Sequence, residues 1–288
     1  RTWEPLPGAV RWTLRKKQKA KIKQKNKCPE KLIRTEAAKE IAEIDCSLQN
    51  QKYQLRCRAA IDLLTAKLNM INADLSRKKR HVVINQISSR VKTAESIYTK
   101  LIRKGLEPDF DTARAELKDL IGIRVVCPFE DEVYEVADRL KAQGDVQIIR
   151  EKDYIKNPKE SGYKSYHMLV SVPIFLSDSV VDTKVEIQIR TIAMDFWASL
   201  EHKIYYKFEG NAPEYISKDL QECAKMVSEL DDKMLSLNEA IQECIAQQDK
   251  DQIRMNEELM NDVCRDVLGN NKEYKDSKVQ EKVTEIVT

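Results

Sequence analysis

A short strand-like segment carries the polar side chains best suited to chemistry. Residues 185–190 read VEIQIR, and in an extended strand successive side chains point to opposite faces. Glu186, Gln188 and Arg190 therefore share one face, and three apolar side chains share the other. An ordinary amphipathic strand with one solvent-facing side is the commoner meaning of this pattern. The helix expected next, at 191–208, is too apolar to lie exposed, and it favours a functional site on the polar face.

A second carboxylate, Asp119, stands at the entrance of an apolar strand expected at 121–127. Carboxylate oxygens are ligands that Mg²⁺ accepts in proteins, so Asp119 could hold this ion. The alternative is a strand-start cap or an ion pair with a neighbouring lysine. Taken alone, Asp119 favours that alternative.

Two basic segments could bind phosphate groups. The loop between residues 152 and 167 contains a proline, a glycine and the lysines Lys152, Lys156, Lys159 and Lys164, a composition suited to phosphates. There Tyr163 could stack on a base while His167 contacts a phosphate; a solvated lysine loop is the alternative. In the second segment the residues that could clamp a triphosphate are Arg90, Lys92, Ser96, Lys100 and Arg103. A surface helix with scattered charge is the alternative there.

Common catalytic motifs are missing from the sequence. It contains no GxxxxGK[ST] loop, GxGxxG, GxSxG or HExxH. Its three histidines form no adjacent His-Asp pair of the kind that marks a metal-dependent phosphohydrolase. A nucleotide-binding enzyme with this sequence would therefore not be a P-loop protein.

The elements that must position these side chains follow from periodicity. Helices are expected at 30–78, from Thr93 onward, at 130–143 and at 191–208. Strands are expected at 81–87, 121–127, 146–152, 166–172 and 183–190, the last two as a hairpin, and 153–162 is expected as a loop. Mixed strands and helices predict an α/β or α+β sheet domain.

After Gly210 the sequence becomes helical again, with an apolar seam in 4-3 spacing. Its members are Ile216, Leu220, Cys223, Val227, Leu230, Met234, Leu237, Ile241 and Cys244. This spacing is typical of a coiled coil, and such a stripe requires a partner surface. The pattern leaves open whether the partner is the same chain or another one.

Charge and cysteine content limit the cellular environments and partners that the sequence suits. Net charge is +3 at pH 7, but residues 1–27 hold ten Lys and Arg against one Glu. We expect a solvated, disordered tail there, with a loose RNA contact through phosphates as the alternative. The seven cysteines have wide spacings and no CxxC, which favours reduced thiols in the cytosol. No segment predicts a secretory signal or a membrane span.

Several strings, taken together, resemble the synthetase domain of the RelA/SpoT family, and most of all its small single-domain alarmone synthetases. They are SRVK from Ser89, DLIGIRVVCPF from Asp119, DYIKNPKESGYKSYH from Asp153, VEIQIRTIAMDFWASLEH from Val185, and Tyr206-Lys207. They occur in the family's order across about 120 residues. The family often has Asn where this chain has Ser161.

This resemblance implies a fold and a division of the chain. The fold is a mixed, mainly antiparallel five-stranded sheet of nucleotidyltransferase type, flanked by helices. The expected regions are a basic tail at 1–29, helices at 30–80, the catalytic domain at 81–210, oligomerisation helices at 211–270 and a polar tail at 271–288.

The resemblance also implies a reaction, the transfer of pyrophosphate from ATP to the 3′-hydroxyl of GTP or GDP. Glu186 would activate the hydroxyl and, with Asp119, bind Mg²⁺. Arg90 and Arg124 would flank the adenine. The residues implied for the donor phosphates are Lys92, Ser96, Lys100 and Arg103. Tyr163 would stack on guanine and Asp195 would read its edge. The residues implied for phosphates of either nucleotide are Lys152, Lys159, His167 and Gln188.

Two further expectations rest on the family, a homotetramer and a role in stringent-response signalling. Two alternatives to the main function stay open. One is pyrophosphate transfer to another acceptor, such as an adenine nucleotide or a tRNA 3′-end. The other is a catalytically dead oligomeric module that binds nucleotide.

Overall fold

The structure is a computed structural model that describes residues 30–207 and 213–270, with side chains described at 35–204 and 213–265. The tails expected at 1–29 and 271–288 lie outside the described residues, as do the side chains of Tyr206 and Lys207. The chain forms two compact units, one up to Asp232 and one from Lys233. Within the described ranges, every helix is too short or too polar to cross a membrane.

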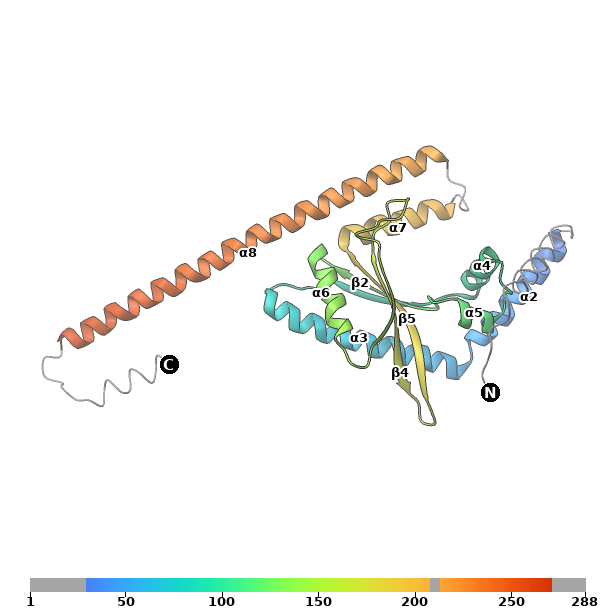
Figure 1. The fold of residues 1–288 in the computed structure, drawn as a ribbon, viewed down its shortest axis with the longest axis horizontal. Helices are drawn as coiled ribbons and strands as arrows, with labels where there is room; N and C mark the ends of the chain where they lie inside the picture. The colour runs from blue at the N-terminus through green and yellow to red at the C-terminus, as the bar shows by residue number, and fades with distance from the viewer. Residues whose placement is uncertain (1–29, 208–212, 271–288) are drawn as a thin grey trace, which may run out of the picture. The chain divides into compact units, whose positions relative to one another are not determined.

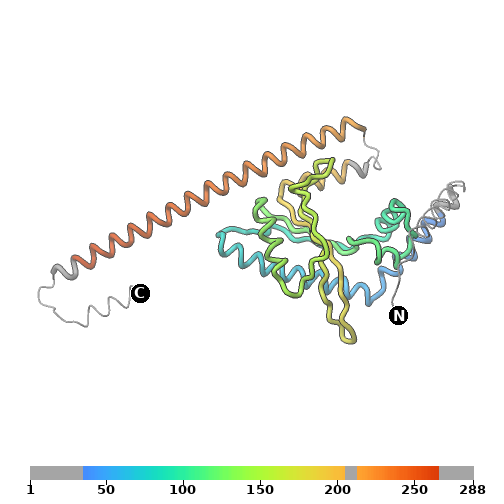
Figure 2. Tube along the Cα trace, viewed as in Figure 1, coloured from blue at the N-terminus to red at the C-terminus, as the bar shows by residue number. Residues whose placement is uncertain are grey.

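A five-stranded sheet forms the centre of the first unit (Figure 1). Its strands are β1 (Gln86–Val91), β2 (Ile121–Cys127), β3 (Gln147–Asp153), β4 (Tyr166–Phe175) and β5 (Val180–Thr191). Their spatial order is β1-β2-β5-β4-β3; β2 and β5 are parallel and all other neighbours are antiparallel. The mixed, mainly antiparallel sheet is thereby confirmed. The expected hairpin is confirmed too, and the tube in Figure 2 follows β4 into β5 through its turn.

Strand alternation divides the sheet into an apolar and a polar face. On β5, Val185, Ile187 and Ile189 are fully buried. They pack in one core with α3 (Gln51–Lys79) and α6 (Glu130–Lys141). The even-numbered residues 186, 188 and 190 consequently lie on the opposite face, as the sequence predicts.

The helical region before the sheet is divided, so the prediction of one helix over 30–78 is wrong in this detail. The first helix, α2, runs from Glu30 to Leu48 and α3 begins at Gln51. Asn50 accepts hydrogen bonds from the backbone N–H groups of Lys52 and Tyr53. This is an N-cap, which starts a new helix.

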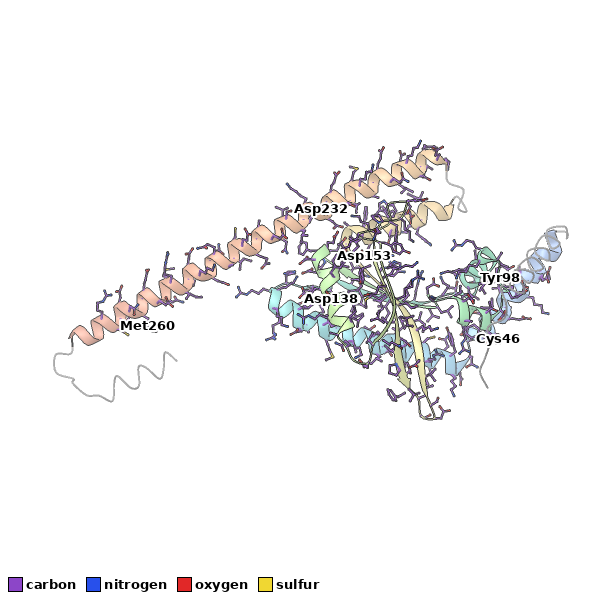
Figure 3. The ribbon with its side chains drawn as sticks, viewed as in Figure 1. Cys46, Tyr98, Asp138, Asp153, Asp232 and Met260 are labelled. Carbon is purple, nitrogen blue, oxygen red and sulfur yellow. The ribbon has the colours of Figure 1, made fainter. Side chains whose placement is uncertain are left out.

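A smaller core lies beside the sheet and fixes α4 (Ala94–Lys104). It joins α2, α4 and the short helix α5 (Phe110–Glu116). Tyr98 of α4, labelled in Figure 3, packs against it. The predicted helix start at Thr93 is confirmed, because its hydroxyl caps the backbone N–H of Ser96.

The first strand begins at Gln86 and not at His81, so the prediction of a strand over 81–87 is wrong at its start. Val83 and Ile84 are buried, but their backbone N–H groups donate to side chains of α3. The acceptors are Ser76 Oγ for Val83 and Asn72 Oδ1 for Ile84. A donor satisfied in this way leaves no ladder hydrogen bond to form.

Two helices follow the sheet, α7 (Ile192–Lys207) and α8 (Glu214–Asn270). The first turns of α8 pack on the first unit, where Leu220 and Ala224 are buried with Tyr163 and Trp197. Farther along α8, the seam residues Leu230, Met234, Leu237 and Ile241 are 45–56% exposed. Within the described residues the predicted seam thus divides, because its beginning is buried in this small core and its later members are exposed.

Candidate active site

Two carboxylates, Asp119 and Glu186, line the same two neighbouring cavities on the polar face. The volumes of these cavities are about 710 and 110 Å³. Glu186 lies on β5 opposite Gly122 of β2, and Asp119 comes two residues before β2. The parallel pairing of β2 and β5 therefore brings both carboxylates to one part of the sheet.

Asp119 is held by two lysines from neighbouring elements. Lys92 and Lys100 donate to its Oδ2 atom at 2.7 and 2.6 Å. Burial acts to raise the pKa of Asp119, but the two ammonium groups outweigh it and lower the pKa to about 2. The other oxygen, Oδ1, is buried without a hydrogen-bond partner among the described residues. An ionised oxygen in that state is costly, which indicates a position for a ligand.

Glu186 is also an ionised carboxylate at neutral pH. Gln188 donates to its Oε2 atom at 2.8 Å, and His167 Nδ1 lies 3.7 Å from Oε1. Burial acts to raise the pKa of Glu186, but His167 and Gln188 outweigh it and lower the pKa. Burial also lowers the pKa of His167. An anionic Glu186 beside a neutral imidazole is suited to accept a proton.

Five side chains close a ring of polar contacts that includes Glu186. From His167 the ring continues through the 2.8 Å hydrogen bond between Nε2 and the Tyr163 hydroxyl. Arg190 Nη2 then donates to the Tyr163 hydroxyl at 2.5 Å and to Gln188 Oε1 at 2.7 Å. Gln188 completes the ring at Glu186. Such a network fixes the orientation of each member.

Arg190 is the member of this ring that the sequence did not single out as a site residue. Its side chain is almost fully buried and also pairs with Asp195, at 3.1 Å. The alternating pattern of residues 185–190 predicts that Arg190 shares the polar face with Glu186 and Gln188. The pattern does not indicate that Arg190 is buried. The one available signal was a charged residue immediately before an apolar helix.

The larger cavity has a basic wall. Its lining holds six Lys and Arg and four Asp and Glu residues. Three of its cations were not predicted as site residues, namely Lys104, Lys118 and Arg150. A concave surface with excess positive charge attracts nucleotide phosphates.

Tyr163 differs from the exposed stacking surface that its predicted role suggests. It is 9% exposed, with Lys159 Nζ 4.3 Å and Arg190 Cζ 5.1 Å from its ring centroid. Tyr154, also missed by the sequence, meets it edge to face. Lys159 therefore occupies part of the ring surface on which a base would stack.

The structure brings ten of the fourteen predicted site residues to the two cavities. They are Arg90, Lys100, Asp119, Arg124, Lys152, Lys159, Tyr163, His167, Glu186 and Gln188. Lys92 lines neither cavity but forms an ion pair with Asp119, which lines both. Asp195 forms ion pairs with Arg124 and Arg190. Ser96 and Arg103 line neither cavity.

The acidic pair is compatible with Mg²⁺. Within the described ranges, no three His, Cys, Asp or Glu residues converge into a complete metal site. Mg²⁺ commonly takes only one or two protein carboxylates and completes its shell with water and substrate phosphates. Asp119 and Glu186 fit that arrangement, with Asp119 Oδ1 as the uncommitted oxygen.

Comparison with known proteins gives consistent matches. Residues 89–211 match the family described as "Region found in RelA / SpoT proteins". The GTP pyrophosphokinase YwaC of Bacillus subtilis is 42% identical over 63% of this chain and 87% of its own length. The GTP pyrophosphokinase YjbM of the same organism is 35% identical over 69% of this chain and 92% of its own length.

A solved structure shares the fold. The small alarmone synthetase 1 of Bacillus subtilis, bound to its product pppGpp, is 34% identical to this chain with a TM-score of 0.61. The match covers 68% of this chain and 99% of that one. The matched relatives are thus nearly fully spanned, while about a third of this chain lies outside the match.

Proposed function

The chain belongs to the RelA/SpoT family, and on this basis we propose that it is a GTP pyrophosphokinase. It transfers a pyrophosphate group from ATP to the 3′-hydroxyl of GTP or GDP, giving (p)ppGpp and AMP. The observation that carries the proposal at the site is Glu186, an ionised carboxylate beside a large basic cavity.

In the proposed reaction the 3′-oxygen of the acceptor attacks the β-phosphorus of ATP. A new O–P bond forms, and the bond from the β-phosphorus to the oxygen that bridges it to the α-phosphorus breaks. AMP leaves with that oxygen. Glu186 accepts the proton of the 3′-hydroxyl, and Gln188 and His167 keep its carboxylate ionised beforehand. The remaining work is orientation and charge neutralisation.

The donor and acceptor sides of the site are assigned from the family resemblance. On the donor side we assign Arg90 and Arg124 to the adenine, and Lys92, Ser96, Lys100 and Arg103 to the ATP phosphates. Lys100 and Lys92 are already aligned by Asp119. On the acceptor side we assign Lys152, Lys159, Tyr163, His167, Gln188 and Asp195 to the guanine nucleotide. Arg190 touches several of these and positions them.

We assign Mg²⁺ to Asp119 and Glu186. When bound, the ion would neutralise charge on the ATP phosphates and on the departing AMP. The uncommitted Oδ1 atom of Asp119 supports this assignment.

Four broader assignments complete the proposal. The catalytic region spans residues 81–210, and the exposed seam on α8 supports self-association, which we assign as a homotetramer by family. The cysteine pattern supports a cytosolic location. The product assigns the protein to the stringent response.

The test is the Glu186→Gln variant, which keeps the shape of the side chain but cannot accept a proton. We expect kcat for AMP release to fall by about 10²- to 10⁴-fold, while nucleotide binding persists. AMP release would be measured with ATP and Mg²⁺ in the presence of GTP, GDP, excess ATP or tRNA as the acceptor.

Glu201→Gln is the matched control, because Glu201 lines the same cavity without an assigned role. It should retain most of the activity. Full activity of Glu186→Gln would refute the assigned base. Failure to release AMP with either guanine nucleotide would refute the assigned acceptor.

A further inference from the structure

A separate cavity of about 360 Å³ lies beside the catalytic pocket, between α3, α5 and the beginnings of β2 and β5. Its cationic lining residues are Arg56, Arg114, Lys118 and Lys184. It has two carboxylates, Asp111 and Asp182, so its lining carries net positive charge. None of the roles assigned to nucleotide binding uses this cavity.

Arg56 is anchored at the floor of the cavity. Its Nε donates to Thr183 Oγ1 at 2.8 Å and its Nη2 donates to the carbonyl oxygen of Asp182 at 2.9 Å. These acceptors are neutral, and the charge of the guanidinium is offset only in part by the nearby Asp182 carboxylate. Hydrogen bonds of this kind hold a guanidinium in one orientation, which pre-organises it for a planar oxyanion.

A second guanidinium lies close by. Burial, and then the positive charge of Arg114, lower the pKa of Arg56. Arg114 forms an ion pair with Asp111, at 3.9 Å. Asp111 is 94% exposed, so this contact neutralises little charge. Two like charges held together in a concave site repel each other unless an anion lies between them.

We propose that this cavity binds a phosphate-bearing anion between Arg56 and Arg114. Guanidinium groups pair with phosphate oxygens through two parallel hydrogen bonds. The volume suits pyrophosphate or the phosphate end of a nucleotide.

The cavity shares a wall with the catalytic pocket. Lys118 lines both cavities, and the next residue is Asp119. An anion bound here would therefore contact the segment that positions a proposed Mg²⁺ ligand. The binding itself does not depend on the proposed reaction.

The test is calorimetric titration of the full chain with inorganic pyrophosphate. We expect two classes of site, because the catalytic pocket also binds anions. Arg114→Gln should weaken one class by about tenfold or more. Lys152→Gln, in the catalytic pocket, should weaken the other. Since Arg114 is half-exposed and contacts the exposed Asp111 and the face of the Phe110 ring, its variant should keep nearly the wild-type thermal stability.

Arg58→Gln is the matched control, since Arg58 lies on the same helix as Arg56, is exposed, and lines none of these cavities. It should leave both classes unchanged. An Arg114→Gln isotherm that superimposes on the wild-type one overturns the proposal. Repeating the titration with GTP identifies the source: an effect of Arg114→Gln on pyrophosphate alone indicates a free anion, and an effect on both indicates a nucleotide.

Discussion

The guanidinium group of Arg190 contacts side chains from three different segments of the chain. It donates to Tyr163 in the loop before β4, to Gln188 on β5 and to Asp195 on α7. Arg190 is 4% exposed, so these contacts replace water almost completely. One buried group therefore links the proposed acceptor residues to the side chains that orient Glu186.

Replacing Arg190 by Lys tests this positioning role. Lysine keeps the positive charge but lacks the planar guanidinium with its several N–H donors. It therefore cannot contact all of these acceptors together. We expect kcat to fall by about 10- to 100-fold, with little change in the KM for ATP because Arg190 lies on the acceptor side. Steady-state kinetics of AMP release would measure both.

The same variant should change the pH dependence. In the native site His167 and Gln188 lower the pKa of Glu186 against the effect of burial. When His167 and Gln188 lose their alignment, the effect of burial prevails and the pKa of Glu186 rises. Glu186 then becomes protonated at a higher pH than in the native site. The acidic limb of the kcat profile should then shift to higher pH. An unshifted limb would contradict the positioning role.

At the scale of elements, the loop before β4 is held under α8 by close packing at Gly162. Its φ is +87°, and a Cβ at this position would lie 2.4 Å from Cβ of Ala224 on α8. Tyr163 follows directly and belongs to the same small core. The loop that carries this acceptor residue therefore depends on the absence of a side chain.

Gly162→Ala should destabilise the fold by more than the cost of placing an alanine at a positive φ, because the added Cβ would also clash with Ala224. Gly105→Ala is the matched control, since Gly105 has φ +69° but nothing within 4 Å of the added Cβ. We expect a loss of about 1 kcal/mol for Gly105→Ala and about 2–4 kcal/mol for Gly162→Ala, measured by denaturant unfolding. Equal losses would show that packing on Ala224 is unimportant. Adding Ala224→Gly to the second variant should recover part of the difference.

How far the sequence predicts the elements depends on what holds each one. β2 begins and ends where its alternating apolar pattern predicts, because the pattern reflects the core directly. The start of β1 and the break at Asn50 depend on side-chain hydrogen bonds, which periodicity does not reveal. The short helix α5 was missed because seven residues with an Asp109 cap carry little periodic signal.

The candidate site was predictable to a similar extent. Most of the residues that the family motifs predict for the site, Glu186 and Asp119 among them, line the two cavities. The motifs did not reveal that Arg190 would be buried or that Lys159 would cover Tyr163. Both features depend on how α7 and α8 close over the loop, which is a tertiary effect.

At the scale of the whole molecule, α8 extends well beyond the part of it that packs on the first unit. Thr191 Oγ1 donates to Asp231 at 2.7 Å, near the end of that unit. Beyond Asp231 the helix continues to Asn270. Met234, Leu237 and Ile241 are 45%, 48% and 56% exposed, although an apolar stripe of this kind is stable in water only when covered.

We expect a second copy of the chain to cover this stripe, because its 4-3 spacing is that of a self-pairing helix. Replacing Leu237 and Ile241 together by Lys should reduce the molecular mass in solution, measured by sedimentation velocity over a range of concentrations. Burial of each side chain contributes roughly 1.5–3 kcal/mol, so the dissociation constant should rise by at least about a hundredfold.

Glu239→Lys is the matched control, since Glu239 is exposed between these two residues and is not part of the seam. It makes a comparable charge change at the same level of the helix and should leave the mass unchanged. Both seam residues lie in the second unit, outside the proposed catalytic region. A double variant with native mass would therefore assign assembly to another surface and leave the catalytic proposal intact.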